Sequence, residues 1–150
     1  MTMSSEDGFS QKFEITGRDF SNAGRISTSI KEILKEIGID RSIVIRASIA
    51  SYEAEMNVVM YADRAVLTLN ITPEKLHLKL DDEGSGIENV EMAMQEGFST
   101  ATDEMREMGF GAGMGLPNIK KNADKFKISS IPGKGTSLDI IFCLNKTEKK

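Results

Sequence analysis

Two successive segments with alternating apolar residues constrain the fold of this 150-residue chain most strongly. In AVLTLNI (65–71), leucine or isoleucine occupies every second position from Leu67, and in LHLKL (76–80) leucine occupies every second position. Side chains of a strand alternate between the two faces of a sheet, so each segment is predicted to be a strand with one buried face. The intervening TPEK is predicted to be a turn. Paired strands with one apolar face require a covering layer, which helices elsewhere in the chain can supply.

Further segments complete the expected sheet and its cover. Strands are predicted at 9–15, at 127–131 and, after the turn PGKG, along the residues up to Leu144. Helices are predicted at 21–38, 41–62 and 87–95, and from Pro117 onward, with a glycine-bearing loop at 97–115. The expected fold class is α+β. It is a two-layer α/β sandwich, with a mixed, mostly antiparallel sheet covered on one face by helices.

The ends of the predicted helices carry capping signals. Ser21 or Asn22 is expected to cap the first helix, and Gly38 to end it. Asp40 is expected to cap the second helix. The whole chain is predicted to be a single domain with a core at about 9–144 and frayed polar ends.

Charge and composition exclude several classes of function. The net charge is −4 and the basic residues are scattered, so direct nucleic-acid binding is not expected. One cysteine and one histidine rule out an intramolecular disulfide and a zinc site of several cysteines or histidines, so a metal would be held by oxygens, which favours magnesium. The sequence contains no membrane-length apolar run and no signal-peptide pattern, so a cytoplasmic location is expected.

The segment DDEGSG (81–86) follows the strand that ends at Leu80. Continued alternation places Asp82 on the buried side, where a carboxylate is costly unless something hydrogen-bonds it. Gly84 and Gly86 remove side chains just beyond it, so backbone can approach a ligand closely. An ordinary acidic turn is the alternative interpretation.

The segment YEAEMN (52–57) lies on the second predicted helix. Glu53 and Asn57 are four residues apart and share one face, whereas Glu55 points away from Glu53 by about 200°. An amide oxygen can bind magnesium, and a nearby carboxylate can deprotonate a hydroxyl. A solvated polar face is the alternative.

The run GFGAGMGLPNI (109–119) passes from a glycine-rich loop into a predicted helix start. Backbone N–H groups at such a start can cradle a phosphate. The run matches neither a Walker nor a Rossmann loop. In PGKGTSL (132–138), the glycines suit a hairpin turn, and the Thr136 hydroxyl is the functional candidate.

The order of these four motifs resembles the ATP-binding domain shared by gyrase, the ninety-kilodalton heat-shock chaperone, histidine kinases and mismatch-repair proteins. This is the Bergerat fold of GHKL proteins. The resemblance covers about residues 9–144. The segment GMGLPNIKKNADKFKISSIPGKGTSL is particularly similar to the bacterial anti-sigma-factor serine/threonine kinases and related switch kinases that act on STAS-domain proteins.

The resemblance implies ATP and Mg²⁺ as cofactors and a role for each motif residue. Glu53 would be the general base toward a substrate hydroxyl, and Asn57 would coordinate magnesium. Asp82 would accept a hydrogen bond from the adenine amino group. The other expected nucleotide-binding positions are Gly84, Gly86, Gly111, Gly113, Gly115, Leu116 and Thr136.

The roles of Tyr61 and Arg64 stay open, since NVVMYADR departs from the pattern of many relatives after the asparagine. Lys120 is open as well, because it could contact a phosphate or be a solvated surface lysine. Glu55 is a second acid in the motif, but helical geometry favours Glu53 as the base.

Three functions are compatible with these motifs. The first is a kinase that phosphorylates a serine or threonine of a STAS-type antagonist. The second is an anti-sigma protein that sequesters a sigma factor in a nucleotide-dependent way, with little phosphotransfer. The third is a histidine-kinase-like catalytic domain. The expected partners are a STAS-domain antagonist, a sigma factor or both, without direct nucleic acid or membrane contact, and a homodimer through the first strand and helix is compatible with the resemblance.

Overall fold

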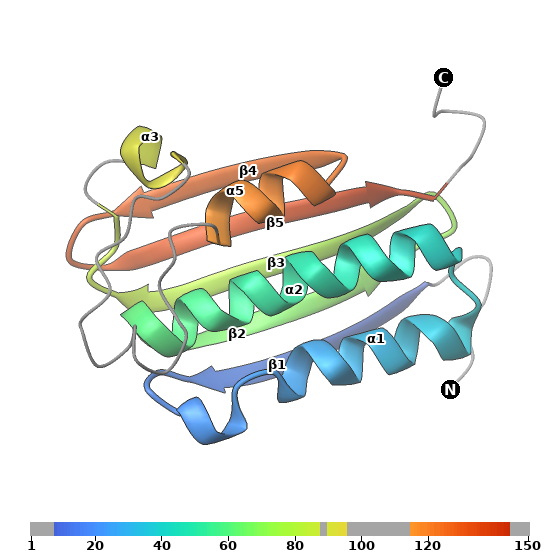
Figure 1. Ribbon diagram of the computed structural model, residues 1–150, viewed down its shortest axis with the longest axis horizontal. Helices are drawn as coiled ribbons and strands as arrows, with labels where there is room; N and C mark the ends of the chain where they lie inside the picture. The colour runs from blue at the N-terminus through green and yellow to red at the C-terminus, as the bar shows by residue number, and fades with distance from the viewer. Residues whose placement is uncertain (1–7, 88–89, 96–114, 145–150) are drawn as a thin grey trace.

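The computed structural model of the chain describes residues 8–87, 90–95 and 115–144 (Figure 1). The strands are β1 (Phe9–Thr16), β2 (Ala62–Ile71), β3 (Lys75–Gly84), β4 (Lys125–Ile131) and β5 (Gly135–Cys143). The α-helices are α1 (Arg25–Ile37), α2 (Arg41–Tyr61), α3 (Val90–Ala93) and α5 (Gly115–Asn122), and a short 3-10 turn spans Phe20–Asn22.

The described strands form one five-stranded sheet in the order β1-β2-β3-β5-β4. All four pairings among the described strands are antiparallel. The sheet was expected to be mixed and mostly antiparallel, and the parallel part of that expectation is wrong for these strands. The hairpin predicted from the two alternating segments is confirmed as β2 and β3, with Leu69 opposite Leu78. β3 continues to Gly84, which carries Asp82 onto the strand itself.

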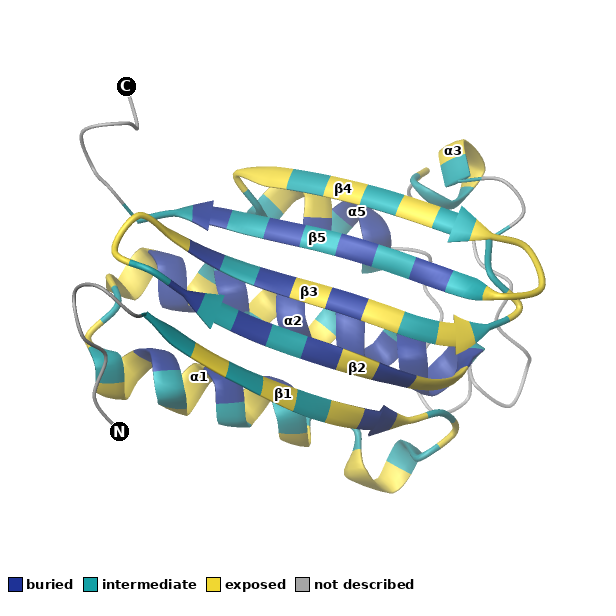
Figure 2. Ribbon diagram, turned by 180° about the vertical axis from the view of Figure 1, so that it is seen from behind, coloured by how far each residue is buried: buried dark blue, intermediate teal, exposed yellow. Residues whose placement is uncertain are grey.

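Helices α1, α2 and α5 lie side by side on one face of the sheet (Figure 1). The inward residues of the central strands, among them Leu67, Leu78 and Ile140, are fully buried beneath them. Seen from the opposite side, buried and exposed residues alternate along the strands, and no described helix covers that face (Figure 2). The predicted two-layer α+β sandwich is therefore confirmed.

The helix ends agree only in part with the sequence signals. Gly38 ends α1 with a φ of 89°, as predicted. The expected caps Ser21 and Asn22 are wrong, because α1 begins after Gly24 and both side chains instead bond to Asp19. The amides at the start of α1 are satisfied from another helix, which local sequence does not reveal.

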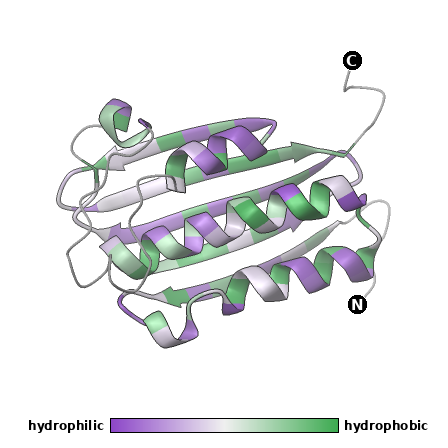
Figure 3. Cartoon of the chain, in the orientation of Figure 1, coloured by the Kyte–Doolittle hydropathy of each residue, from purple (hydrophilic) through white to green (hydrophobic). Residues whose placement is uncertain are grey.

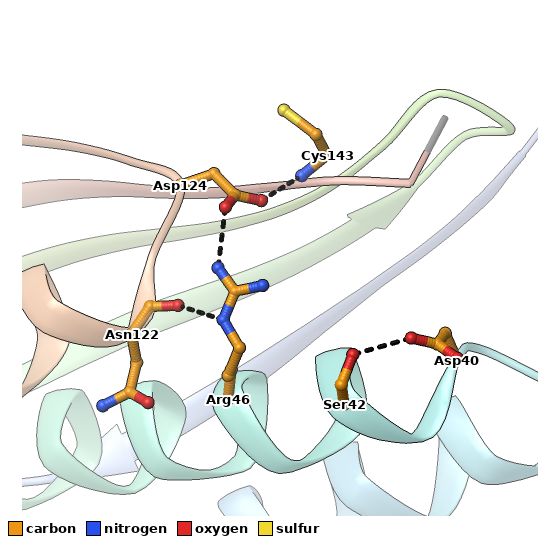
Figure 4. Close-up of polar contacts among 6 residues, drawn as sticks. All are labelled: Asp40, Ser42, Arg46, Asn122, Asp124 and Cys143. Atoms are coloured by element: carbon orange, nitrogen blue, oxygen red, sulfur yellow. Dashed lines mark hydrogen bonds and ion pairs between the residues drawn. The ribbon is translucent and has the colours of Figure 1, made fainter. Parts of the chain in front are cut away.

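Asp40 does occupy the position before α2, but its side chain makes no capping bond to the α2 backbone. It accepts a hydrogen bond from the Ser42 hydroxyl at 2.7 Å (Figure 4). The short helix predicted at 87–95 is confirmed only for Val90–Ala93. The helix expected from Pro117 is described from Gly115, and most of the expected glycine loop lies outside the described residues.

Arg46 ties α2 to α5 and to the sheet (Figure 4). Its Nε donates to the carbonyl of Asn122 at 2.9 Å, and its Nη2 contacts Asp124 Oδ1 at 2.7 Å. The other Asp124 oxygen accepts the N–H of Cys143 at 2.7 Å, and the guanidinium lies 5.4 Å from the centre of the Phe142 ring. The C-terminal end of α5 is thereby fixed against α2 and β5.

Candidate functional site

Glu53 and Asn57 lie one turn apart on α2 and face the start of α5. Asn118 Nδ2 donates to Glu53 Oε2 at 2.8 Å, a contact that the sequence motifs did not indicate. A Cβ placed on Gly115 would lie 3.2 Å from Asn57 Oδ1 and 3.7 Å from Glu53 Oε1. The glycine therefore leaves open the space between the first turn of α5 and these two oxygen-bearing side chains.

The Asn57 side chain makes no hydrogen bond to any described residue, although it is half-buried. Glu53 uses one oxygen toward Asn118, and no described residue donates to the other. An amide oxygen and a carboxylate oxygen that lie close together, with no described donor bonded to either, are suited to bind a cation or a hydrogen-bond donor of a ligand.

Glu55 points to the other side of α2, toward α1. It accepts the backbone N–H groups of Gly24 at 3.0 Å, Ile26 at 3.3 Å and Ser27 at 3.0 Å. The residue is only 2% exposed, and these donors compensate for burial of its carboxylate. Glu55 is thus committed to the start of α1, whereas Glu53 faces α5.

Asp82 lies at the inner end of β3, where the β4–β5 hairpin meets it. Its Oδ1 accepts the Thr136 N–H at 2.8 Å, and the Thr136 hydroxyl lies 3.0 Å from the Ser130 hydroxyl. Burial raises the pKa of Asp82 above its ordinary value, the Thr136 N–H opposes that shift, and the charge of Asp81 adds to it. No described residue donates to Oδ2, so this oxygen of the half-buried Asp82 can accept a donor from a ligand.

Gly84 and Gly86 are explained by contacts within the chain. A Cβ on Gly84 would lie 3.0 Å from Ala62 Cα. Gly86 has a φ of +73°, and its Cβ would lie 2.6 Å from the carbonyl oxygen of Ile131. Gly86 is therefore required by the packing at the end of β3, whether or not a ligand binds there, and a side chain at Gly84 would be tight against β2.

The remaining predicted positions are placed as follows. Leu116 is buried and belongs to the hydrophobic core. Gly111 and Gly113 lie outside the described residues. Lys120 is exposed, and Tyr61 is half-buried at the end of α2.

Arg64 pairs with Glu83 at 3.0 Å on the uncovered face of the sheet, with both side chains exposed. It therefore lies on the opposite side of the sheet from Glu53 and Asn57.

The described residues form two clusters at the same end of the molecule. One joins Glu53, Asn57 and the N-terminal turn of α5, a kind of position where backbone amides and the helix dipole favour an anion. The other joins Asp82 and Thr136. Gly84 lies against the junction of α2 and β2, so the two clusters lie at the same end of the helix layer.

The described residues contain no group of three His, Cys, Asp or Glu side chains that could hold a metal ion by itself. A metal at this site would need further oxygens from a ligand or water. None of the described helices is long and apolar enough to span a membrane.

Comparison with known proteins assigns residues 19–142 to a family described as the histidine kinase-like ATPase domain. The chain is 28% identical to the serine/threonine-protein kinase RsbT of Bacillus subtilis over 115 residues, 74% of this chain and 80% of that protein. It is 32% identical to an anti-sigma F factor of Caldanaerobacter subterraneus over 76% of this chain and 72% of the relative.

An anti-sigma F factor of Clostridium acetobutylicum is 33% identical over 63% of this chain. Both the RsbT kinase and the anti-sigma F factors are therefore relatives of this chain at about 30% identity. The family match covers the helices and strands that carry both clusters. The chain thus belongs to the histidine kinase-like ATPase domain family, the GHKL family that its motif order predicted, and this membership implies ATP binding.

Proposed function

We propose that the chain is an ATP-dependent serine/threonine protein kinase that transfers the γ-phosphoryl group of ATP to a hydroxyl of a STAS-type antagonist protein. The arrangement of Glu53 and Asn57 beside Gly115 carries this proposal. It puts a carboxylate that can accept a proton next to an amide oxygen and a helix N-terminus that suits phosphates.

The residues present fit a magnesium–nucleotide complex. Asn57 offers an amide oxygen without a described partner, and the absence of a Cβ at Gly115 leaves room beside it. Since Mg²⁺ typically takes one or two protein oxygens plus phosphate oxygens and waters, Asn57 would supply the protein oxygen and the nucleotide and water the others. The metal would neutralise charge on the phosphates.

Side chains of this protein would supply the general base and the adenine contact. Asn118 holds Glu53 Oε2, which leaves Oε1 to take the proton of the attacking hydroxyl. In that step the substrate oxygen bonds to the γ-phosphorus, and the bond from this phosphorus to the β–γ bridging oxygen breaks. ADP leaves with the electron pair. Asp82 Oδ2 would accept the adenine amino N–H, while the Thr136 N–H fixes Oδ1.

A second function is favoured by a specific observation. Relatives that are 31–33% identical to this chain are named anti-sigma F factors. Nucleotide-dependent sequestration of a sigma factor, with little phosphotransfer, is therefore the alternative. A histidine-kinase-like activity is a third candidate, since the matched family is histidine kinase-like.

The variant Glu53→Gln tests the kinase proposal. We expect it to bind ATP with Mg²⁺ as the wild type does in calorimetry and to lose transfer by about 10²–10⁴-fold, because the general base is gone. Glu32→Gln, an exposed glutamate on α1, is the matched control and should retain full activity. The phosphorylated product should be acid-stable.

Other outcomes decide among the three functions. Undiminished transfer by Glu53→Gln would exclude this mechanism. Acid-labile phosphate on the product would indicate transfer to histidine. A wild type that binds ATP and a sigma factor but transfers nothing would establish the sequestration function.

A further inference from the structure

The solvent face of α2 carries an apolar stripe formed by Ile45, Ile49 and Tyr52. These side chains are 50%, 39% and 42% exposed, whereas most large hydrophobic residues in the described part of the chain are buried. At about 100° per residue, the three lie within about 60° of one another. In Figure 3, which views the helix layer from its solvent side, hydrophobic colour recurs along α2.

This α2 stripe is not explained by packing within the described molecule. The inward side of α2 is formed by other residues, among them Ile43, Ala47 and Ala54, which are buried against the sheet. α2 therefore presents apolar side chains on two opposite sides. Exposed apolar side chains gathered on one face, as opposed to scattered singly, indicate contact with a partner.

Cations border the α2 stripe. Arg41 is exposed and precedes Ile45 by four residues, so it continues the same line on the helix. On α1, exposed Lys31 and Lys35 lie about 40° and 80° from Ser27, the residue whose amide bonds to Glu55 of α2. These three cations form a basic border along one side and one end of the stripe.

Acidic groups near the α2 stripe are turned away from it or engaged. Glu32 and Glu36 lie about 140° and 180° from Ser27 and so face away from α2. Asp40 accepts the Ser42 hydroxyl. The face is therefore locally basic in a chain with a net charge of −4.

The stripe leads directly to the proposed catalytic group. Tyr52 is followed by Glu53, whose carboxylate lies about 100° further round the same helix, toward α5. A protein seated on the stripe would place its own surface within reach of Glu53.

We propose that the α2 stripe is the docking surface for the protein substrate, and that the docking region of this substrate is apolar with an acidic margin. The inference rests on the proposed kinase function and specifies how the kinase selects its partner. A second copy of the chain is a poorer occupant. A two-fold contact through this face would bring identical basic borders into one interface, where they repel.

The test measures phosphorylation of purified bacterial STAS-domain proteins by Ile49→Ser. Loss of one buried isoleucine from the interface should raise KM for the STAS protein about tenfold, with kcat and ATP affinity unchanged. Val66→Ser is the matched control, because Val66 is 37% exposed but lies on the opposite face of the sheet. It should leave KM unchanged.

Charge reversal provides an independent arm. Lys31→Glu should also raise KM and should reduce its dependence on salt, whereas Lys12→Glu, an exposed lysine on β1, should do neither. An unchanged KM in both Ile49→Ser and Lys31→Glu would overturn the inference. A wild-type dimer in analytical ultracentrifugation that becomes monomeric in Ile49→Ser would also overturn the inference, since a second copy of the chain would then bind the α2 stripe.

Failure of the kinase proposal is distinguishable from failure of the docking inference. If the wild type binds a STAS protein without phosphorylating it, the kinase proposal fails. The same variants then test docking through Kd, with the same tenfold weakening expected. If the wild type neither phosphorylates nor binds any STAS protein, the docking inference is overturned.

Discussion

Asp82 shows how a single carboxylate can be fixed in position by the fold through one oxygen, while its other oxygen accepts no hydrogen bond from a described residue. Its Oδ1 is held by the Thr136 N–H at the join between β3 and β5. Alternation along β3 predicted its inward direction, because strand geometry is local. The Thr136 donor was not predictable, since it comes from 54 residues further along the chain.

At this residue, the folded-state pKa lies above the ordinary value, mainly because of burial. The stabilising contribution of Asp82 is therefore fully present below its unfolded pKa of about 3.9 and is lost as pH rises through the raised folded value. Asp82→Asn keeps an oxygen for Thr136 but cannot ionise. We expect its free energy of unfolding, relative to wild type, to increase across that pH window and to level off above it.

Urea unfolding of wild type and Asp82→Asn at a series of pH values, from about 3, below the ordinary carboxyl pKa, to about 8, measures the difference in their free energies of unfolding. Asp63→Asn, at an exposed position, is the control and should give a flat difference. A flat difference for Asp82→Asn as well would mean that burial does not perturb this carboxyl.

At the scale of elements, strands were predicted well and helix starts less well. Four of the five described strands were marked by alternation, which depends only on burial of one face, whereas 127–131 was predicted as a strand without it. The start of α1 was misplaced because its amides are satisfied by Glu55, which lies 31 residues beyond Gly24. Helical geometry did predict that Glu53 and Glu55 face different sides, and the structure places them toward α5 and α1. The contact from Asn118 was not predictable, because it requires knowing that α5 packs on α2.

The link between α1 and α2 gives an element-scale prediction. Glu55→Ala leaves three backbone donors at the start of α1 without their carboxylate and should lower the free energy of unfolding by about 2–3 kcal/mol. Glu55→Gln should lose less, because an amide oxygen still accepts. Chemical denaturation measures both. Hydrogen exchange should show earlier opening at the start of α1 than in α5.

The control for this prediction is Glu36→Ala, on the exposed side of α1, which should change stability by less than about 0.5 kcal/mol. Equal losses for Glu36→Ala and Glu55→Ala would show that the contacts of Glu55 contribute nothing specific.

For the whole molecule, the order of motifs predicted the family, and the alternating strands with their covering helices predicted the two-layer architecture. The order of motifs did not predict that Gly86 is needed by the fold itself, or that Gly84 lies close against Ala62. The sequence alone does not distinguish a glycine that makes room for a ligand from a glycine that makes room for a neighbouring strand.

Ligand binding should stabilise the entire domain. If ATP with Mg²⁺ binds only the folded chain, the free energy of unfolding should rise by about 2.7 kcal/mol at a concentration of 100 Kd. Thermal unfolding with and without nucleotide measures the gain, and chelation of magnesium should reduce it. Tripolyphosphate, which lacks the adenine, should stabilise less. An unfolding temperature that ignores both ATP and ADP would contradict nucleotide binding.

The contacts that Arg46 makes with Asn122 and Asp124 determine how α5 is held on the sheet. They immobilise the end at Asn122 through the main chain and through Asp124, while the opposite end, at Gly115, meets α2 through side-chain contacts alone. Leu116 and Ile119 also pack this helix into the hydrophobic core. The helix is therefore a rigid connection between the residues that face Glu53 and the strands beneath, and Arg46→Ala would loosen only its distal end.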